Sequence, residues 1–366
     1  MSTNAEKIKS GEDVGVDVGA IEREFAGLWH QAGEDAHDTS NKPVTRACLA
    51  NLLVWVDREE MLAPLKSAFE QLVVSVPARV LVLQVEDAKA GAPEFESYIS
   101  ANCILAPGGG KLVCSEEVTL VARGDGTQHL GSVVRALLVP NVPIMALLSE
   151  PPARGAETAN ALVPLIDRLL VDSGAVRDVA QWKALGKIMV RAPEVVDLGW
   201  MALSSFRSAL SSVFDHHEPR TALEGLREVS LVAPKSRLAG RILLLGWLAD
   251  RLQWSAPVKQ ADGGVKYASP HGPVTVRVGQ REAVEGKEEP ATELLLTTSK
   301  GNIRLCRGKE PHVVVESLGH DGRAMALDPS TLGERIARAM GPRAPDALYT
   351  KAWKRSAELL GILGLA

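Results

Sequence analysis

The segment from Ala47 to Val56 (ACLANLLVWV) is a continuous apolar run that ends at the charged residue Asp57. A strand with one face in water needs a polar residue at every second position, so this run indicates a strand buried on both faces. Strands of this kind occur in α/β proteins, where helices cover both faces of a mostly parallel sheet. The run therefore predicts an α/β fold.

The segments that follow support this prediction. Glu59–Leu72 is expected to be a helix and Ala78–Val85 (ARVLVLQV) a second buried strand. Glu94–Leu105 and Leu112–Ala122 are expected to be strands that form an antiparallel hairpin, because the turn signal Pro107-Gly108-Gly109-Gly110 separates them.

The alternation of helix and strand continues to about residue 215. A further buried strand is predicted at Val142–Leu148, and Leu231–Ala233 is expected to return a strand to the same sheet. The predicted helices are Ile21–Ala32, Leu130–Leu138, Ala156–Arg168, Val176–Leu185 and Ser204–Phe214.

Arg237–Trp254 is predicted to be a strongly apolar helix that carries Trp247 and Trp254. Seven residues make two helical turns, so both indoles are expected on one side of this helix, with Trp247 in a structural role.

The composition changes at Ser255, where short strands alternate with turn signals. They predict an antiparallel β-meander with one hydrophobic face, followed by two closing helices. The first helix is expected to begin at Asp328-Pro329 and the second to run from Pro345 to Leu363. The predicted organisation is a mobile tail at residues 1–19, an α/β domain at 20–254, and an antiparallel sheet with closing helices at 255–366.

The chain has a net charge of −4 and a pI of about 6.1, and its densest basic cluster is the short Lys351–Arg355. A nucleic-acid partner requires clustered Lys and Arg, so none is expected. The N-terminus has no apolar region of the kind found in signal peptides, and no apolar run is long enough to span a membrane. We therefore expect a soluble cytoplasmic protein.

No motif points to catalysis, a cofactor or a metal ion. In Pro107–Lys111 (PGGGK) the residue after the lysine is Leu112, where a phosphate loop needs Ser or Thr. His216-His217 follows a predicted helix and is interpreted as its C-terminal cap. The four cysteines lack CxxC spacing, and Cys103 and Cys114 lie in apolar runs. We expect them to be small buried hydrophobic groups and expect no regulatory disulfide.

Three arginines lie in apolar surroundings: Arg79 in a buried strand, Arg135 in an apolar helix, and Arg207 directly after Phe206. A charge in such a place is usually paired within the fold or lies at a surface that a partner covers. Both interpretations stay open for each arginine, and the structural ion pair is favoured.

Several segments, in this order, resemble the OpcA family of bacterial glucose-6-phosphate dehydrogenase assembly proteins. The resemblance covers roughly Ala47 to Trp254. The matching pieces are Ser75–Val80, Cys114–Val118, Leu137–Pro143, Asp172-Ser173, Asp197–Trp200 with Phe206-Arg207, and Leu244–Leu248. The chain departs from the usual family pattern at Ala78 and at Ala146-Leu147, where the family often has Cys or Ser and a Trp pair.

The resemblance implies a non-catalytic accessory protein of the oxidative pentose phosphate pathway. Such a protein binds glucose-6-phosphate dehydrogenase and promotes its active oligomer or its allosteric activation. The candidate contact residues are Trp200, Arg207, Arg79 and Arg135, and self-association is left open. The alternatives are an enzyme or sugar-phosphate sensor with a pocket in the α/β domain, and a scaffold without effect on catalysis.

Overall fold

The structure is a computed structural model that describes residues 6–8, 18–28, 44–46, 48–57, 59–87, 94–105, 112–152, 156–282, 292–307, 312–327 and 330–364. The chain forms two compact units. Unit 1 comprises Met1–Val171, Leu185–Val196 and Thr331–Arg343, and unit 2 comprises Asp172–Ala184, Asp197–Ser330 and Ala344–Ala366. The predicted boundary between Trp254 and Ser255 thus falls inside unit 2.

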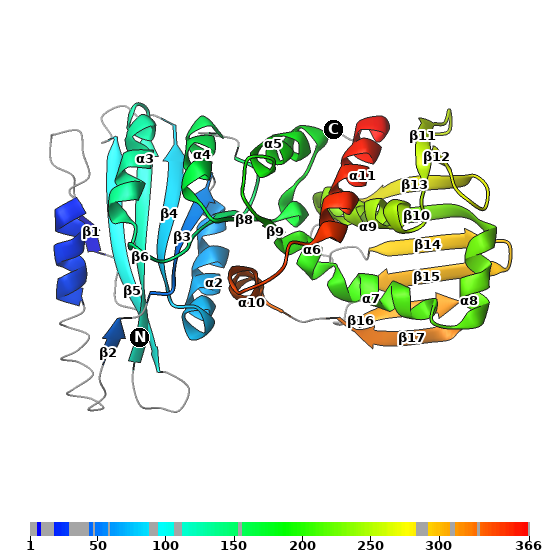
Figure 1. Cartoon of the computed structure of the whole chain (residues 1–366), viewed down its shortest axis with the longest axis horizontal. Coiled ribbons are helices and arrows are strands. Elements are labelled where there is room, and N and C mark those ends of the chain that lie inside the picture. The colour runs from blue at the N-terminus through cyan, green and yellow to red at the C-terminus, as the bar shows by residue number, and fades with distance from the viewer. Residues whose placement is uncertain are drawn as a thin grey trace. The chain divides into compact units, whose positions relative to one another are not determined.

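Unit 1 is built on a mostly parallel sheet, which confirms the predicted α/β fold (Figure 1). The strand order is β1 (Glu6–Ile8), β5 (Phe95–Leu105), β6 (Leu112–Arg123), β4 (Ala78–Glu86), β3 (Ala50–Val56), β7 (Ile144–Leu148), β8 (Arg168–Val171) and β9 (Val195–Asp197), with β2 (Val44–Arg46) beside β6. Every residue of β3 is buried. β5 and β6 pair antiparallel as predicted, while the proposed turn at 107–110 lies outside the described residues.

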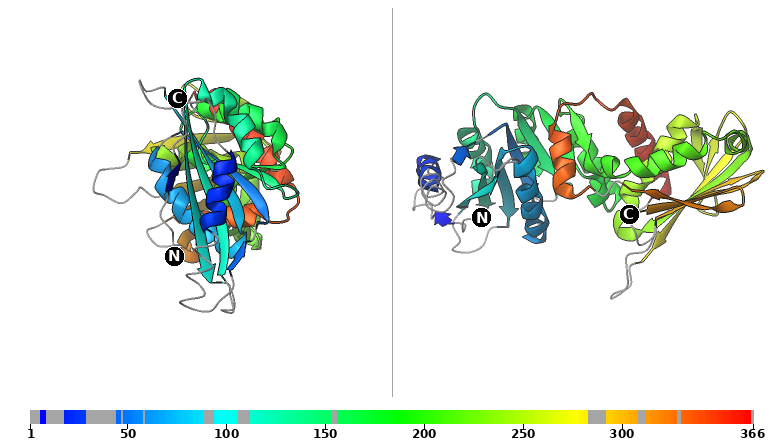
Figure 2. Two further views of the ribbon diagram at one scale, coloured as in Figure 1. Left: turned by 90° about the vertical axis from the view of Figure 1, so that its left-hand side faces the viewer. Right: turned by 90° about the horizontal axis from the view of Figure 1, so that it is seen from below.

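Helices cover both faces of this sheet, and α2 and α3 lie on opposite sides of it (Figure 2, left). The helices of unit 1 are a helix over residues 18–28, α2 (Leu62–Ser75), α3 (Gly126–Leu137), α4 (Ala156–Leu162) and α10 (Leu332–Met340), with short 3-10 turns η1 (Glu59–Met61) and η2 (Val163–Leu165). α5 (Val179–Met189) begins in unit 2 and ends in unit 1.

Two predictions at element ends differ from the structure. The N-cap of α10 is Thr331, whose hydroxyl accepts from the Glu334 backbone while the Glu334 carboxylate accepts from the Thr331 backbone. This reciprocal pair satisfies two helix N–H groups, and the helix begins at Leu332, whereas the predicted start at Asp328-Pro329 lies outside the described residues. Within the predicted mobile tail, Glu6–Ile8 forms β1, which pairs with β5.

Unit 2 holds an eight-stranded sheet. The strand order is β11 (Ser255–Lys259), β12 (Val265–Ala268), β13 (Val274–Arg281), β10 (Leu226–Pro234), β14 (Glu293–Thr298), β15 (Gly301–Arg307), β16 (His312–Ser317) and β17 (His320–Ala326). β10 is parallel to β13, and the other pairings are antiparallel. The expectation that Leu231–Ala233 joins the first sheet is wrong. Alternate residues of β10 are buried, which suits a sheet with one covered face.

The helices of unit 2 gather on one face of this sheet, where α9 packs on β10 and α7 on β16 (Figure 1). They are α6 (Leu198–Ala202), α7 (Ser204–Val213), α8 (His217–Ala222), α9 (Leu238–Arg251) and α11 (Ala347–Leu363), with η3 (Ser173–Ala175), η4 (Leu223–Gly225) and η5 (Lys235–Arg237). α9 and α11 approach closely at Gly246, where a Cβ would overlap Ser356 Oγ and the Ala352 carbonyl oxygen.

Two predictions for this region are wrong. α9 ends at Arg251, so Trp254 lies beyond the helix and does not share a helical face with Trp247. Trp254 is buried against Tyr267, whereas Trp247 is half-buried. His216 is the N-cap of α8 and does not cap the preceding helix, because α7 already ends at Val213.

Candidate partner-binding site

The site is built around Asp197, the N-cap of α6 in unit 2. Its Oδ1 accepts hydrogen bonds from the backbone N–H of Gly199 (2.9 Å) and of Ser173 (3.0 Å). A Cβ at position 199 would overlap Ser173 Oγ, so glycine is needed where these two segments meet. Asp172, which directly precedes Ser173, caps η3 by accepting a hydrogen bond from Gly174 N. Asp172-Ser173 and Asp197–Trp200, two pieces of the family resemblance, are therefore brought together.

Asp197 is almost fully enclosed, with 2% of its surface exposed. Burial raises the pKa of its carboxyl to about 6, although the backbone N–H of Ser173 opposes this shift. Tyr349 also faces this carboxyl, and burial followed by the charge of Asp197 raises the pKa of its phenol. Tyr349 therefore stays neutral at physiological pH.

Arg207 on α7 stacks on the indole of Trp200. Its guanidinium carbon lies 3.4 Å from the centroid of the Trp200 ring, and Nη1 donates a 2.7 Å hydrogen bond to the Trp200 carbonyl oxygen. Burial lowers the pKa of Arg207 to about 10, and the carboxylates of Asp346 and Asp197 oppose that shift. The guanidinium is therefore charged at neutral pH, half-buried and fixed in direction.

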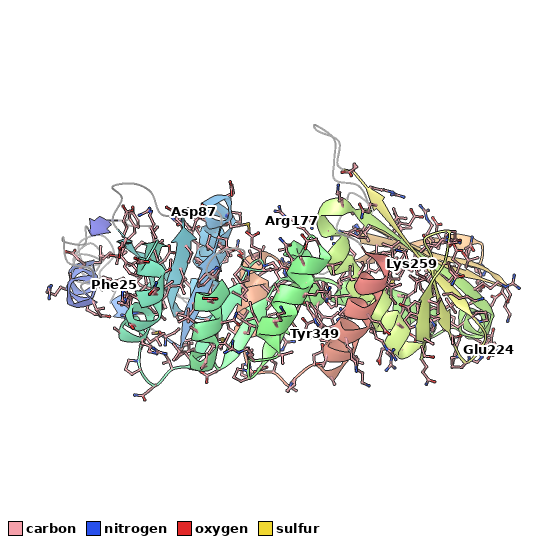
Figure 3. The ribbon with its side chains drawn as sticks, turned by 90° about the horizontal axis from the view of Figure 1, so that it is seen from above. Phe25, Asp87, Arg177, Glu224, Lys259 and Tyr349 are labelled. Atoms are coloured by element: carbon pink, nitrogen blue, oxygen red, sulfur yellow. The ribbon has the colours of Figure 1, made fainter. Side chains whose placement is uncertain are left out.

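Asp346 fixes Trp200 from the other side. Its Oδ2 accepts a 2.7 Å hydrogen bond from Trp200 Nε1, while its Oδ1 caps α11 by accepting from Tyr349 N at 3.0 Å. Tyr349, labelled in Figure 3, lies tilted against Trp200 with ring centroids 5.9 Å apart.

Further aromatic rings extend the cluster along α11. Trp353 lies 6.0 Å from Tyr349 and stacks on Trp182 of α5, with centroids 3.9 Å apart and ring planes 11° apart. We call the following residues the Trp200 cluster: Trp182, Asp197, Trp200, Arg207, Asp346, Tyr349 and Trp353.

Trp200 itself is 4% exposed, and Trp182, Asp197 and Tyr349 are also buried, so Arg207, Asp346 and Trp353 are the members of the Trp200 cluster that reach the surface. Trp, Tyr and Arg are the side chains most enriched among the residues that dominate binding energy at protein interfaces. Around the cluster, Leu348 is 42% exposed, and Ser208 and Lys351 are exposed. The arrangement can present one fixed cation beside apolar surface.

The two other candidate arginines lie in unit 1 and differ from each other. Arg79 is 3% exposed and pairs with Glu116 and Glu22, and it also donates to the Leu137 carbonyl oxygen at 2.8 Å. Its guanidinium therefore serves the interior of unit 1, as the ion-pair interpretation predicts. Arg135 lies on the exposed side of α3 and remains a candidate contact.

Ligands of open α/β sheets usually bind at the carboxyl ends of the strands, where the strand order reverses. In this sheet the strand order reverses at β3. The residue at the carboxyl end of β3 is Asp57, whose carboxylate accepts a 2.7 Å hydrogen bond from Trp55 Nε1. A cavity of about 20 Å³ lies against β3, β4 and β7 and has an apolar lining that includes Leu53, Leu83 and Leu148. A sugar phosphate needs a pocket of roughly 300 Å³ or more, so this cavity gives no support to the enzyme or sensor alternative.

A surface groove of about 520 Å³ lies at the opposite, amino ends of β7 and β8 and is lined in part by Asp167, Arg168 and Glu194. Arg168 already donates to Glu194 and to the carbonyl oxygens of Ala339 and Gly341. The guanidinium is therefore committed within the fold and is poorly placed to bind a phosphate.

The cysteines depart from the prediction. Cys114 is disulfide-bonded, and the strand register places Cys103 directly opposite it, whereas Cys48 and Cys306 are free. Cys114 is buried as predicted, but it is held in a disulfide and is not a free thiol; that this bond has no regulatory role stays a prediction. The two cysteines lie on the two strands of the predicted hairpin, at equal distances from the turn signal at 107–110, so this register could have been read from the sequence.

Within the described ranges, no group of three His, Cys, Asp or Glu side chains is arranged to hold a metal ion. Among the same residues, no helix has the length and apolar character that crossing a membrane would require.

Sequence reasoning found Trp200 and Arg207 but missed Asp346, Tyr349, Trp182 and Trp353. The local signal for Asp346 was present, because an Asp directly before a helix is a typical N-cap. Its second role, as acceptor for an indole 146 residues away in the chain, has no local signal.

Two family models match the chain. Residues 70–186 match the N-terminal domain of the glucose-6-phosphate dehydrogenase subunit family, and residues 193–353 match the C-terminal domain of the same family.

Curated relatives carry the name OxPP cycle protein OpcA. The protein of Synechocystis is 27% identical over 190 residues, which are 51% of this chain and 39% of that protein. The protein of Nostoc punctiforme is 25% identical over 171 residues, or 46% of this chain and 37% of its own length. The chain thus aligns with less than half the length of these relatives. Among solved structures, biliverdin reductase from Synechocystis is similar with a TM-score of 0.48 and 8% identity, covering 86% of this chain and 98% of that one.

Proposed function

The chain belongs to the glucose-6-phosphate dehydrogenase subunit family, also named OpcA, and from this membership we propose that it binds glucose-6-phosphate dehydrogenase as a non-catalytic accessory protein. The observation that carries the proposal is that both domain models of this family match, in order, over residues 70–186 and 193–353. The role belongs to the oxidative pentose phosphate cycle, after which the relatives are named.

The proposed contact is the part of the Trp200 cluster that reaches the surface, namely Arg207 with the half-buried Asp346 and Trp353. Asp172-Ser173, Asp197–Trp200 and Arg207 carry the family resemblance, and they converge in one place although they come from separate segments. Arg207 is held by Trp200 and keeps its charge, so it can bind a carboxylate of the dehydrogenase without first being ordered.

Activation follows from differential affinity. A protein that binds the substrate-competent state of the dehydrogenase more tightly than the inactive state shifts the equilibrium toward the former. The enzyme then needs less glucose 6-phosphate to reach a given rate, so we expect a lower apparent KM.

The test uses the purified cognate dehydrogenase with increasing amounts of this protein. We expect saturable binding and a fall in apparent KM along the same titration curve. Binding without any change in KM or kcat would support the scaffold alternative. Absence of binding would refute the proposed function. Activity of this protein alone toward a sugar phosphate would favour the enzyme alternative.

A further inference from the structure

Within the part of the chain that the structure describes, the second sheet has one face that the helices of unit 2 leave uncovered. On the covered face, Leu294, Leu296, Ile303 and Leu305 are buried beneath the helices. The alternate residues point the other way and are only half-buried. We call this second surface the open face. Its central residues are Val232 and Ser230 of β10, Leu295 of β14, Cys306 of β15 and Val314 of β16.

Around these residues the open face carries alternating charges that are already paired. Arg304 bridges Glu293 (2.7 Å) and Glu316 (3.4 Å), and Arg281 also binds Glu293 at 2.9 Å. On β13, Arg277 binds Glu228 at 3.0 Å. The face therefore carries three arginines and Lys266, balanced by three glutamates and Asp262 at its edge.

We propose that the open face is a self-association surface, on which a second copy of this chain packs sheet against sheet. A two-fold axis brings the same surface of both copies together, so the surface must be complementary to itself. A face with equal numbers of alternating Arg and Glu meets that condition, because a rotation can place arginines of one copy near glutamates of the other. Charges that are already paired also cost less to bury than unpaired ones.

The size of the open face fits a stable dimer. Eight strands at a spacing of about 4.8 Å span roughly 34 Å, and six residues at about 3.3 Å each give roughly 20 Å along the strands. The footprint is then about 700 Å² per copy, or about 1,400 Å² in total, which lies within the range of specific interfaces. Face-to-face packing of sheets at about 10 Å is the usual way in which such a surface is covered.

The first test is the molar mass of the full chain, measured by sedimentation from about 1 µM to about 100 µM. We expect twice the chain mass of 39.1 kDa for the wild type and the single-chain mass for Leu295→Lys. The matched control is Val190→Lys, which makes the same kind of change at a site 87% exposed on unit 1 and should leave the dimer intact. If Leu295→Lys melts well below the wild type, Ser230→Arg replaces it, because Ser230 lies beside Leu295 in the register.

The second test uses the native thiol of Cys306. In a Cys48→Ser background, spin labels at Cys306 of the two copies should lie within about 40 Å of each other and show dipolar coupling. This distance follows because both labels lie on the shared interface, which is no wider than the sheet. Leu295→Lys should abolish the coupling. A wild type that stays monomeric at every concentration would overturn the proposal. So would a Leu295→Lys variant that remains dimeric while the Cys306 labels show no coupling. A monomer in which Leu295→Lys weakens dehydrogenase binding would assign the open face to the dehydrogenase instead. None of these results affects the proposal that the chain binds the dehydrogenase.

Discussion

Replacing Arg207 by Met separates what this side chain does for the fold from what it does for a partner. Methionine keeps an unbranched apolar stem over the Trp200 ring but removes the charge. The stacking at 3.4 Å and the hydrogen bond to the Trp200 carbonyl oxygen are both lost. We therefore ask whether these losses exceed the gain from no longer burying a guanidinium.

The stability lost with the stacking and the hydrogen bond and the stability gained by not burying the charge nearly cancel. The pKa of Arg207 falls from 12.5 to about 10, so its surroundings disfavour the charged form by about 3 kcal/mol, which the neutral side chain recovers. Against this, the cation–π contact is worth about 1–2 kcal/mol and the charged hydrogen bond about 1.5–3 kcal/mol. We expect the free energy of unfolding to change by no more than about 1–2 kcal/mol, which is a shift in Tm of about 2–8 °C.

Binding should respond more strongly than stability. The loss of a charged anchor at an interface typically costs about 2 kcal/mol or more, which corresponds to roughly a 30-fold weaker affinity for the dehydrogenase. The assay measures Tm and dehydrogenase affinity for Arg207→Met and for Arg177→Met, a control at an exposed arginine of unit 2 that is labelled in Figure 3. A Tm more than about 10 °C below the wild type would show that Arg207 is a structural residue. An affinity equal to that of the control would remove Arg207 from the proposed contact.

Four further outcomes are expected. Gly246→Ala should destabilise the fold by about 3 kcal/mol because its Cβ meets the facing helix α11, and a Tm within about 2–4 °C of wild type would contradict the packing. Trp254→Ala should cost about 3–5 kcal/mol in chemical unfolding, since the indole is 1% exposed. Because Cys114 is disulfide-bonded, the unfolded, unreduced chain should titrate two thiols and the reduced chain four; four before reduction would disprove the bond. For Asp197, the folded pKa of about 6 exceeds the ordinary value of 3.8, so this group favours folding below pH 3.8 and loses that contribution as the pH rises through 6. Asp197→Asn keeps the cap, so its stability relative to wild type should rise by up to about 3 kcal/mol between about pH 4 and 7.5, and a constant difference would refute the shift.

The parts of the fold that could be predicted are those whose signal is local. The apolar run of β3 and the strands of the β5–β6 hairpin follow from residue patterns over about ten positions. The short strands beyond Ser255 follow from regular turn signals, but β10 lies between β13 and β14 and divides the predicted antiparallel meander into two parts.

The errors concern pairings between distant segments. β10 looks like another strand of the α/β sheet, yet it pairs with β13 and β14, which lie about 40 to 70 residues further along the chain. Buried and half-buried residues alternate along β10, which distinguishes it from a strand buried on both faces. The prediction considered only the three apolar residues Leu231–Ala233, which are too few to show this alternation. Trp254 was misplaced for a related reason, since the end of α9 is set by the backbone turn at Gln253, whose φ is +56°.

The Trp200 cluster illustrates why the candidate site was only partly predicted and how its rigidity would help it to bind a partner. Asp197 and Asp346 each cap one helix and, with their second contacts, connect that helix to another segment. Trp200 is thereby held at its indole nitrogen, and its ring and carbonyl oxygen in turn hold Arg207. An unrestrained arginine loses about 1–2 kcal/mol of side-chain entropy when it is immobilised at an interface, whereas this one is already ordered. A partner carboxylate that meets Arg207 would therefore gain from the ion pair without most of that loss, which favours this residue over the exposed Arg135 as the anchor for the dehydrogenase.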